Sequence, residues 1–163
     1  MFRGRSRRMW KPAIAITDLP QNRGSGYPEP FKSRMGDRTK VKLGDAFDLT
    51  KFGVNHVTLG PGGQSALRHF HSHEDELVVM LEGELVLVTN LGEQVVTAGM
   101  CMGFRAGAAN AHHLVNRSSA PARYIEVGSR IAADVAFYPD DDLCWVDGGE
   151  GSMVTAHKDG SRY

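Results

Sequence analysis

The residues best suited to chemistry are the histidines, three of which lie in the run His69-Phe70-His71-Ser72-His73. Side chains two positions apart on a β-strand point to the same face, so His69, His71 and His73 can all face one side. A buried imidazole needs a hydrogen-bond partner or a metal ion, and imidazole is the commonest metal ligand in proteins. If this face is the interior of the fold, the spacing favours a metal site over a purely structural pair.

Acidic residues follow at once, at Glu74, Asp75 and Glu76. A carboxylate beside two imidazoles completes a 2-His-1-carboxylate face, which leaves room for further ligands. Nitrogen and carboxylate ligands suit Mn, Fe, Co, Ni or Zn and do not choose among them. The sequence therefore predicts one divalent metal ion of unspecified identity.

Short apolar runs separated by turn signals make up the chain from Thr39 onward, as in FGVNHVTL, ELVVML and LVLVTN. Such runs, without a long amphipathic helix, predict an all-β sandwich or barrel, with one helical turn expected at residues 44–51. We expect a proline- and glycine-rich, extended N-terminal arm at residues 1–40 and a barrel at residues 41–130. A loop-rich C-terminal tail at residues 131–163 is expected to pack on that barrel.

Glycines frame the first cluster of candidate ligands. From Gly63, five residues precede His69, one separates it from His71, four lead to Glu76 and six lead to Gly83. This spacing resembles the first motif of the cupin superfamily, G-x5-HxH-x3-4-E-x6-G. The resemblance implies a double-stranded β-helix, or jelly-roll barrel, with His69, His71 and Glu76 as metal ligands. It also implies that Gly83 makes the turn between two strands, where a positive φ suits a hairpin.

The second cupin motif, G-x5-P-x-G-x2-H-x3-N, is matched with departures. Gly99 opens it and Gly107 stands in place, but Arg105 replaces the proline and the histidine comes two residues late. Counted back from Asn116, His112 has the expected spacing. The resemblance therefore implies His112 as a fourth metal ligand, at the end of a slightly longer loop.

The resemblance implies activity on, or binding of, a small molecule. Our leading hypothesis is a metal-dependent isomerase of sugars or sugar phosphates, in which Glu76, the only carboxylate we can place in the cavity, would move a proton between adjacent carbons. Arg105 is a candidate for binding a phosphate or carboxylate at the mouth, or else a solvated loop residue, and His73 is a candidate at the rim. An Fe(II)-type dioxygenase and a non-catalytic binding or sensor protein remain alternatives.

Composition limits the partners. The 163 residues carry 19 basic and 19 acidic side chains, so no overall charge favours nucleic acid or an anionic membrane. No stretch approaches the roughly 20 apolar residues of a membrane span. Cys101 and Cys144 form no CxxC pair and no disulfide framework, which favours two free thiols and a cytoplasmic location.

Two further expectations concern the N-terminal part. Either Met1 or Met9 could be the native start of the chain. Cupins like this one are commonly dimers, and residues 10–40 are too apolar for a free tail. This segment could cover a neighbouring barrel in a homodimer, or pack on its own.

Overall fold

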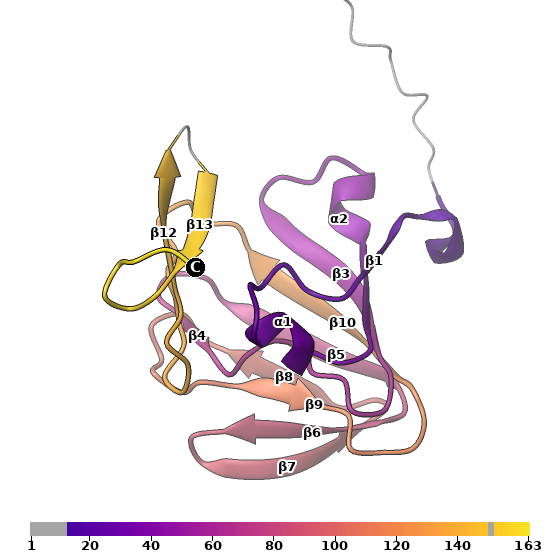
Figure 1. Ribbon diagram of the computed structural model, residues 1–163. Coiled ribbons are helices and arrows are strands. Elements are labelled where there is room, and N and C mark those ends of the chain that lie inside the picture. The colour runs from indigo at the N-terminus through magenta and orange to yellow at the C-terminus, as the bar shows by residue number, and fades with distance from the viewer. Residues whose placement is uncertain (1–12, 150–151) are drawn as a thin grey trace, which may run out of the picture.

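The computed structural model describes residues 13–149 and 152–163, and strands dominate it (Figure 1). Met1, Met9 and Trp10 lie outside the described residues. The helical segments are η1 (Ile16–Asp18), α1 (Phe31–Arg34) and α2 (Leu43–Ala46). The strands are β1 (Gln21–Arg23), β2 (Arg38–Lys42), β3 (Phe52–Leu59), β4 (Phe70–His71), β5 (Glu76–Glu82), β6 (Glu84–Thr89), β7 (Gly92–Thr97), β8 (Cys101–Phe104), β9 (His113–Val115), β10 (Ala122–Ser129), β11 (Ala136–Phe137), β12 (Cys144–Gly149) and β13 (Ser152–Ala156). Within the described residues, none of the helical segments has the length and apolarity that crossing a membrane requires.

The largest sheet has six antiparallel strands in the order β1-β2-β3-β10-β5-β8. Its register aligns Lys40, Val57, Tyr124 and Met80 across four strands. Because paired residues point to the same face of a sheet, these four side chains share the inner face. The same alternation brings polar side chains of β2 and β10 to the inside of the barrel.

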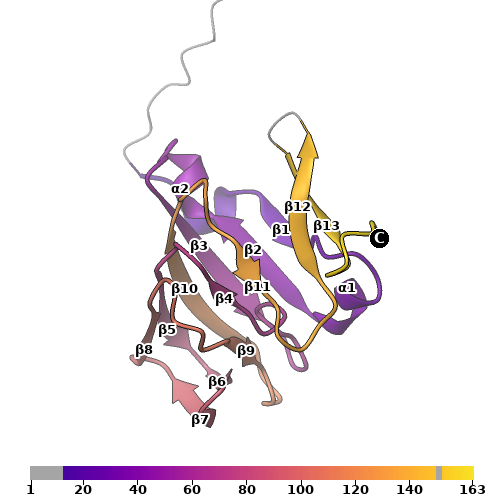
Figure 2. The same cartoon turned by 90° about the vertical axis from the view of Figure 1, so that its left-hand side faces the viewer.

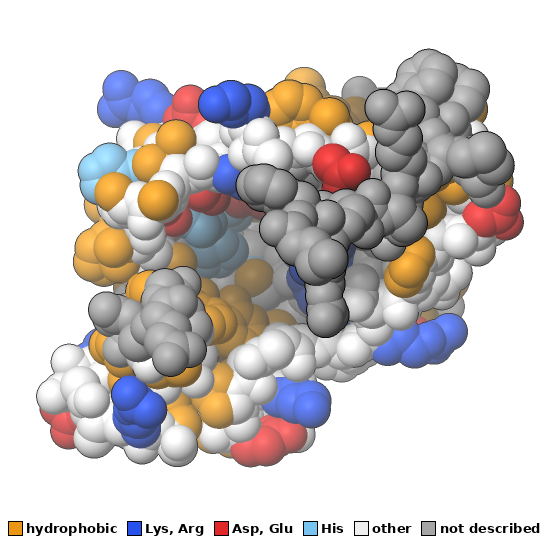
Figure 3. Space-filling model, turned by 90° about the horizontal axis from the view of Figure 1, so that it is seen from above, with side chains coloured by type: hydrophobic (Ala, Val, Ile, Leu, Met, Phe, Trp, Pro, Cys, Tyr) orange, Lys and Arg blue, Asp and Glu red, His pale blue; other side chains and the backbone are white. Residues whose placement is uncertain are grey.

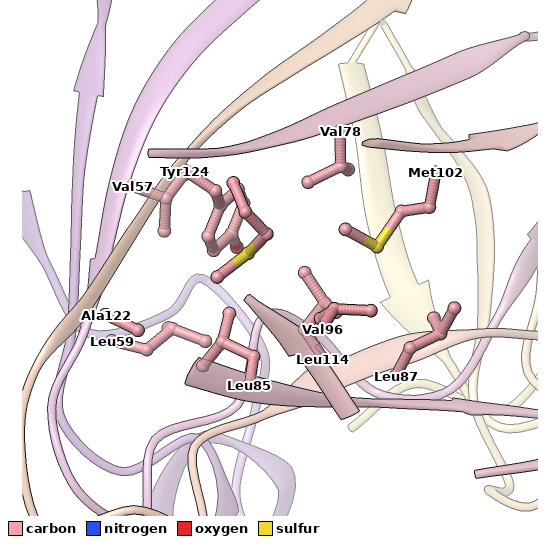
Figure 4. Close-up of a cluster of buried hydrophobic side chains, with 11 residues drawn as sticks. Val57, Leu59, Val78, Leu85, Leu87, Val96, Met102, Leu114, Ala122 and Tyr124 are labelled. Carbon is pink, nitrogen blue, oxygen red and sulfur yellow. The ribbon is translucent and has the colours of Figure 1, made fainter. Parts of the chain in front are cut away.

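The second sheet, β7-β6-β9, faces the first across an apolar core (Figure 4). The residues of this core come from both sheets, and removing their apolar surface from water stabilises the fold. The buried members are Val57, Leu59, Val78, Met80, Leu85, Leu87, Val96, Met102, Leu114, Ala122 and Tyr124. Two facing antiparallel sheets with such a core confirm the predicted all-β jelly-roll barrel.

The N-terminal arm is less separate than the sequence suggested. The boundary expected between residues 40 and 41 falls inside β2, which pairs with β3 of the same barrel and carries β1 on its other edge. Pairing satisfies backbone groups that an exposed edge strand would leave open, which explains why the arm extends the sheet. The predicted homodimer remains a prediction.

The C-terminal tail is also more regular than expected. β11 pairs with β4, and β12 and β13 form a hairpin (Figure 2). Gly148 and Gly149, within the tail expected to be rich in loops, lie at the end of β12. A second apolar cluster joins tail and arm, since Tyr138 and Leu143 pack with Phe31. The tail and the arm therefore pack against each other through this second cluster.

Gly83 connects β5 to β6 with a φ of 77°, as the hairpin reading predicted. A Cβ there would lie 2.9 Å from Ala122 Cα, whereas Gly62, with the same φ, has open space around it. We expect Gly83→Ala to cost about 1–2 kcal/mol for the backbone conformation and about 1–3 kcal/mol more for the clash. Gly62→Ala should show the first cost alone.

Urea unfolding of the two variants measures this difference. Equal losses in the free energy of unfolding would mean that the contact with β10 relaxes freely.

Candidate metal centre and cavity

A cavity of about 370 Å³ opens at one end of the barrel, and histidine, acidic and basic side chains are visible in the hollow (Figure 3). Its walls combine side chains of β2, β5, β8 and β10 with residues of the arm and the tail. The lining residues are Ser25, Gly26, Tyr27, Arg38, Lys40, Ser65, Ala66, His69, His71, Glu76, Val78, Phe104, His112, Leu114, Tyr124, Glu126 and Trp145. A volume in this range is typical of small-molecule sites.

The structure brings His69, His71 and Glu76 together. One potential ligand atom of each lies within 4.8 Å of those of the other two. His71 ends the short strand β4, and Glu76 begins β5 after the turn, so the strand and the turn deliver three donors to one point. This is the arrangement that the first motif predicted.

Contacts at Nδ1 orient the imidazoles of His69 and His71 for metal binding through Nε2. His69 Nδ1 lies 2.8 Å from the Leu67 carbonyl oxygen, and His71 Nδ1 lies 2.6 Å from Asp134 Oδ2. An Nδ1–H donated to an oxygen leaves the Nε2 lone pair for a metal, the usual support of ligating histidines. Burial, with help from the neighbouring His112, lowers the pKa of His69 to about 4, so this ring is neutral near pH 7. The donor set therefore fits a divalent metal ion.

His112 stands beside this cluster. Backbone hydrogen bonds in both directions join it to His69, and its ring stacks on Phe104 with centroids 3.4 Å apart. Its Nε2 lies 2.9 Å from Glu76 Oε2, while its buried Nδ1 has no partner among the described residues. Burial opposes the ionisation of Glu76, yet this hydrogen bond and the nearby imidazoles lower its pKa overall. His112 is positioned near the donors but held to Glu76, so a role as fourth ligand remains a prediction.

Asp134 is a supporting residue that sequence reasoning missed. Besides His71, it accepts hydrogen bonds from the backbone N–H groups of His73 and Glu74. Burial alone would raise its pKa, but these hydrogen bonds and His71 lower it. Asp134 lies more than 60 residues beyond His71 in the tail, and no local spacing connects the two.

His73 and Arg105, the predicted substrate-binding residues, do not line this cavity. β4 ends at His71, so strand alternation does not extend to His73, which is exposed and has its Nδ1 2.8 Å from Ser72 Oγ. Arg105 is exposed and lines a neighbouring cavity of about 230 Å³, which shares His71, Phe104 and His112 with the main one.

Three charged residues that sequence reasoning did not select do line the cavity. Arg38 and Lys40 share the inner face of β2, and Glu126 points inward from β10. Glu126 accepts a hydrogen bond from Asn55 at 2.8 Å and forms an ion pair with Lys40 at 2.5 Å. The expectation that Glu76 is the only carboxylate in the cavity is therefore wrong. The alternation in Arg38-x-Lys40 reveals the two basic residues only once residues 38–42 are assigned to a strand.

Comparison with known proteins agrees with this fold. Residues 55–128 match the cupin domain family. A solved sugar phosphate isomerase of the cupin superfamily from Silicibacter pomeroyi is 39% identical, with a TM-score of 0.87 over 93% of this chain and 96% of that one. The protein thus belongs to the cupin superfamily.

Two other solved structures show how widely the fold is shared. One, from Acidithiobacillus ferrooxidans, is provisionally named a sugar phosphate isomerase; it is 26% identical over 78% of this chain and 81% of its own, with a TM-score of 0.68. The polyketide cyclase RemF from Streptomyces resistomycificus, 23% identical over 74% of this chain and 80% of its own, has a TM-score of 0.58 and shares the fold. No curated protein matched the chain.

Proposed function

We propose that this protein is a divalent-metal-dependent isomerase of a sugar phosphate. The similarity to the Silicibacter pomeroyi isomerase extends over nearly the whole of both chains. The observation that carries the proposal is the presence, in one cavity, of a metal-binding donor set and a second carboxylate, Glu126, outside that set. A metal-assisted aldose–ketose isomerisation by proton transfer would use both parts.

His69, His71 and Glu76 would hold the metal ion, with His112 beside them. When bound, such an ion polarises the carbonyl and hydroxyl oxygens of an open-chain sugar. Tyr138 stacks on His69 with centroids 5.8 Å apart, and Trp145 Nε1 donates to the Tyr138 hydroxyl at 3.0 Å, so aromatic side chains of the tail pack beside this candidate ligand.

Glu126 would transfer the proton. Its carboxylate would take the proton from the carbon next to the carbonyl, exchange it with solvent, and deliver a proton to the former carbonyl carbon, while the hydroxyl proton of the first carbon passes to the former carbonyl oxygen, so that no proton is gained or lost overall. Lys40 and Asn55 fix its position for this task. Glu76, our earlier candidate for this step, is instead engaged by His112 and lies among the imidazoles.

Metal analysis and solvent exchange test the proposal. The full-length protein would be purified without chelators, loaded in turn with Mn, Fe, Co, Ni and Zn, and incubated in D₂O with aldose and ketose phosphates. We expect interconversion of one pair, with deuterium incorporated at the carbon that gains the proton.

Several results would count against the proposal. Failure to bind any of the five metals, or no interconversion across the sugar phosphates, would refute the isomerase. Interconversion without deuterium would retain the isomerase but refute proton transfer by Glu126. Oxygen consumption by the iron-loaded protein would support the dioxygenase instead.

A further inference from the structure

The loop that carries His112 into the metal centre is longer than the second cupin motif expects. Its extra length falls at residues 108–111, which lie between β8 and β9 and outside both strands. A longer loop has more conformations to lose, so other contacts must hold it if His112 is to keep one position. The structure supplies these contacts from two distant segments.

Asn90, in the turn between β6 and β7, holds the loop from one side. Its Nδ2 donates to the Ala109 carbonyl oxygen at 2.9 Å, and its backbone N–H donates to Asn110 Oδ1 at 3.0 Å. The remaining side-chain atom, Asn90 Oδ1, accepts a hydrogen bond from Arg68 Nη1. One amide therefore joins the turn, the loop and Arg68.

Arg68 connects this turn and loop to the tail. Its Nε and Nη2 donate to the two carboxylate oxygens of Asp140 at 2.6 and 2.7 Å, and its Nη1 lies 3.4 Å from the Ala111 carbonyl oxygen. Such a bidentate pair is geometrically specific, so it fixes the plane of the guanidinium. The Arg68 side chain is 19% exposed, against 53% for Arg117 in the surface pair with Glu93, so water competes less for its hydrogen bonds.

The contacts of Arg68 lie directly before two candidate metal ligands. Arg68 precedes His69 in the chain, and Ala111 precedes His112. Backbone hydrogen bonds of 3.1 and 2.8 Å join the two histidines, so Arg68 ties their segments together one residue before each imidazole. His112 Nε2 then lies 2.9 Å from Glu76 Oε2, a contact that a shift of the loop would change.

We propose that Arg68 is a positioning residue of the metal centre, which holds the loop before His112 and so fixes that imidazole beside Glu76. Among the described residues, those that line the main cavity do not include Arg68, so it acts through His112. This role rests on the metal binding of the proposed function, but not on the isomerisation. Arginine suits it because one planar cation serves a carboxylate, an amide oxygen and a backbone carbonyl together, which the compact ammonium of lysine does not.

The position of the His112 ring can be followed in metal-free protein. The ring stacks on Phe104 with centroids 3.4 Å apart and an angle of 1° between the planes. The ring current of Phe104 therefore shifts the ring protons of His112 upfield. Proton NMR of the chelator-treated full-length protein would record these signals, which are assigned by their loss in His112→Ala.

Three variants would be compared with wild type: Arg68→Gln, Asn90→Ala and Arg117→Gln. Arg117→Gln is the matched control, because it also removes a bidentate arginine–carboxylate pair, but one on the surface with Glu93. Asn90→Ala keeps the test sound if Arg68→Gln does not fold, since Asn90 is an exposed turn residue.

We expect the His112 ring signals to move downfield in Arg68→Gln, toward those of an unstacked imidazole. They should move less in Asn90→Ala, because Arg68 keeps its contacts to the tail and to Ala111. Arg117→Gln should leave the signals unchanged. Arg68→Lys should not restore the wild-type signals, since it keeps the charge but loses the fork.

Metal affinity gives a second measurement. We expect Arg68→Gln to weaken metal binding about 10-fold, the lower end of the effects that supporting residues have. If this effect passes through His112, it should disappear once His112 is absent. His112→Ala and the double variant with Arg68→Gln should then bind metal equally, within about 2-fold, as expected of a cycle whose coupling is complete.

The outcomes separate this role from the proposed function. Unchanged His112 signals in both Arg68→Gln and Asn90→Ala would overturn it, whatever the metal affinity. An equal loss of affinity with and without His112 would also overturn it, because Arg68 would then act by another route. A wild type that binds none of the five metals would refute the proposed function, and the signals of the metal-free protein would still decide the role of Arg68.

Discussion

His69→Ala is expected to weaken the binding of divalent metal by more than 100-fold. Loss of a mere supporting hydrogen bond to a ligand costs about 10- to 100-fold in affinity, so loss of the ligand itself should exceed that. The variant removes a neutral imidazole whose Nδ1 is already bound to Leu67, which leaves Nε2 as its contribution to the site. Titration against a chelator of known affinity, with metal analysis of the dialysed protein, measures the effect.

His73→Ala is the matched control. It removes an imidazole from the same His-x-His-x-His run, but one that is exposed and outside the cavity. We expect metal affinity within 2-fold of wild type. An equal loss in both variants would show that strand alternation does continue to His73, and retention of metal by His69→Ala would exclude this cluster as the site.

The same titration of His112→Ala decides the number of ligands. A loss as large as that in His69→Ala would make His112 a fourth ligand. A small loss would mean that His112 mainly orients Glu76, to which its Nε2 is now 2.9 Å away.

The first motif made most of the centre predictable. Strand alternation and the glycine frame are local features, and they placed His69, His71 and Glu76 correctly relative to one another. The short apolar runs separated by turn signals likewise predicted the barrel, because strands of a sandwich or barrel recur at this spacing. Gly83 was predictable for a similar reason, since its positive φ is required by a turn of fixed length.

Contacts between distant segments were not predictable in this way. Asp134 meets His71 only because β11 pairs with β4, a contact for which neither segment carries a local signal. The inner faces of β2 and β10 could be recognised only once the strands were assigned, so Glu126 was missed. His73 lies outside the cavity for the opposite reason, since its spacing matches the run but strand β4 ends at His71.

The arm and the tail complete the cavity that the motif residues begin. Tyr27 of the arm and Tyr138 of the tail lie with their hydroxyl oxygens 3.3 Å apart, and Trp145 donates to Tyr138. Burial of Tyr27 raises its pKa, with a further contribution from Tyr138, so both hydroxyls remain protonated. Tyr27 and Trp145 line the same cavity as the candidate metal ligands, so the arm and the tail supply part of its wall.

Glu126→Gln is expected to lower kcat by about 10²- to 10⁴-fold, the usual contribution of a general acid–base group. Glutamine keeps the length of the side chain and can still accept from Asn55 and Lys40, but it cannot take up a proton from carbon. Because Glu126 lies outside the cluster of His69, His71 and Glu76, metal affinity should be unchanged. Deuterium incorporation from D₂O should fall in parallel with kcat.

Glu93→Gln is the control, since it changes an exposed glutamate that pairs with Arg117 on the surface. Its kcat should equal that of wild type, because an exposed ion pair contributes little. If Glu126→Gln retains wild-type kcat and metal affinity, Glu126 does not transfer the proton. Glu76, whose carboxylate contacts the imidazoles, then becomes the candidate for this step. If Glu126→Gln loses metal as well as activity, Glu126 helps to hold the metal ion. The proposed mechanism, in which metal binding and proton transfer belong to different residues, is then refuted.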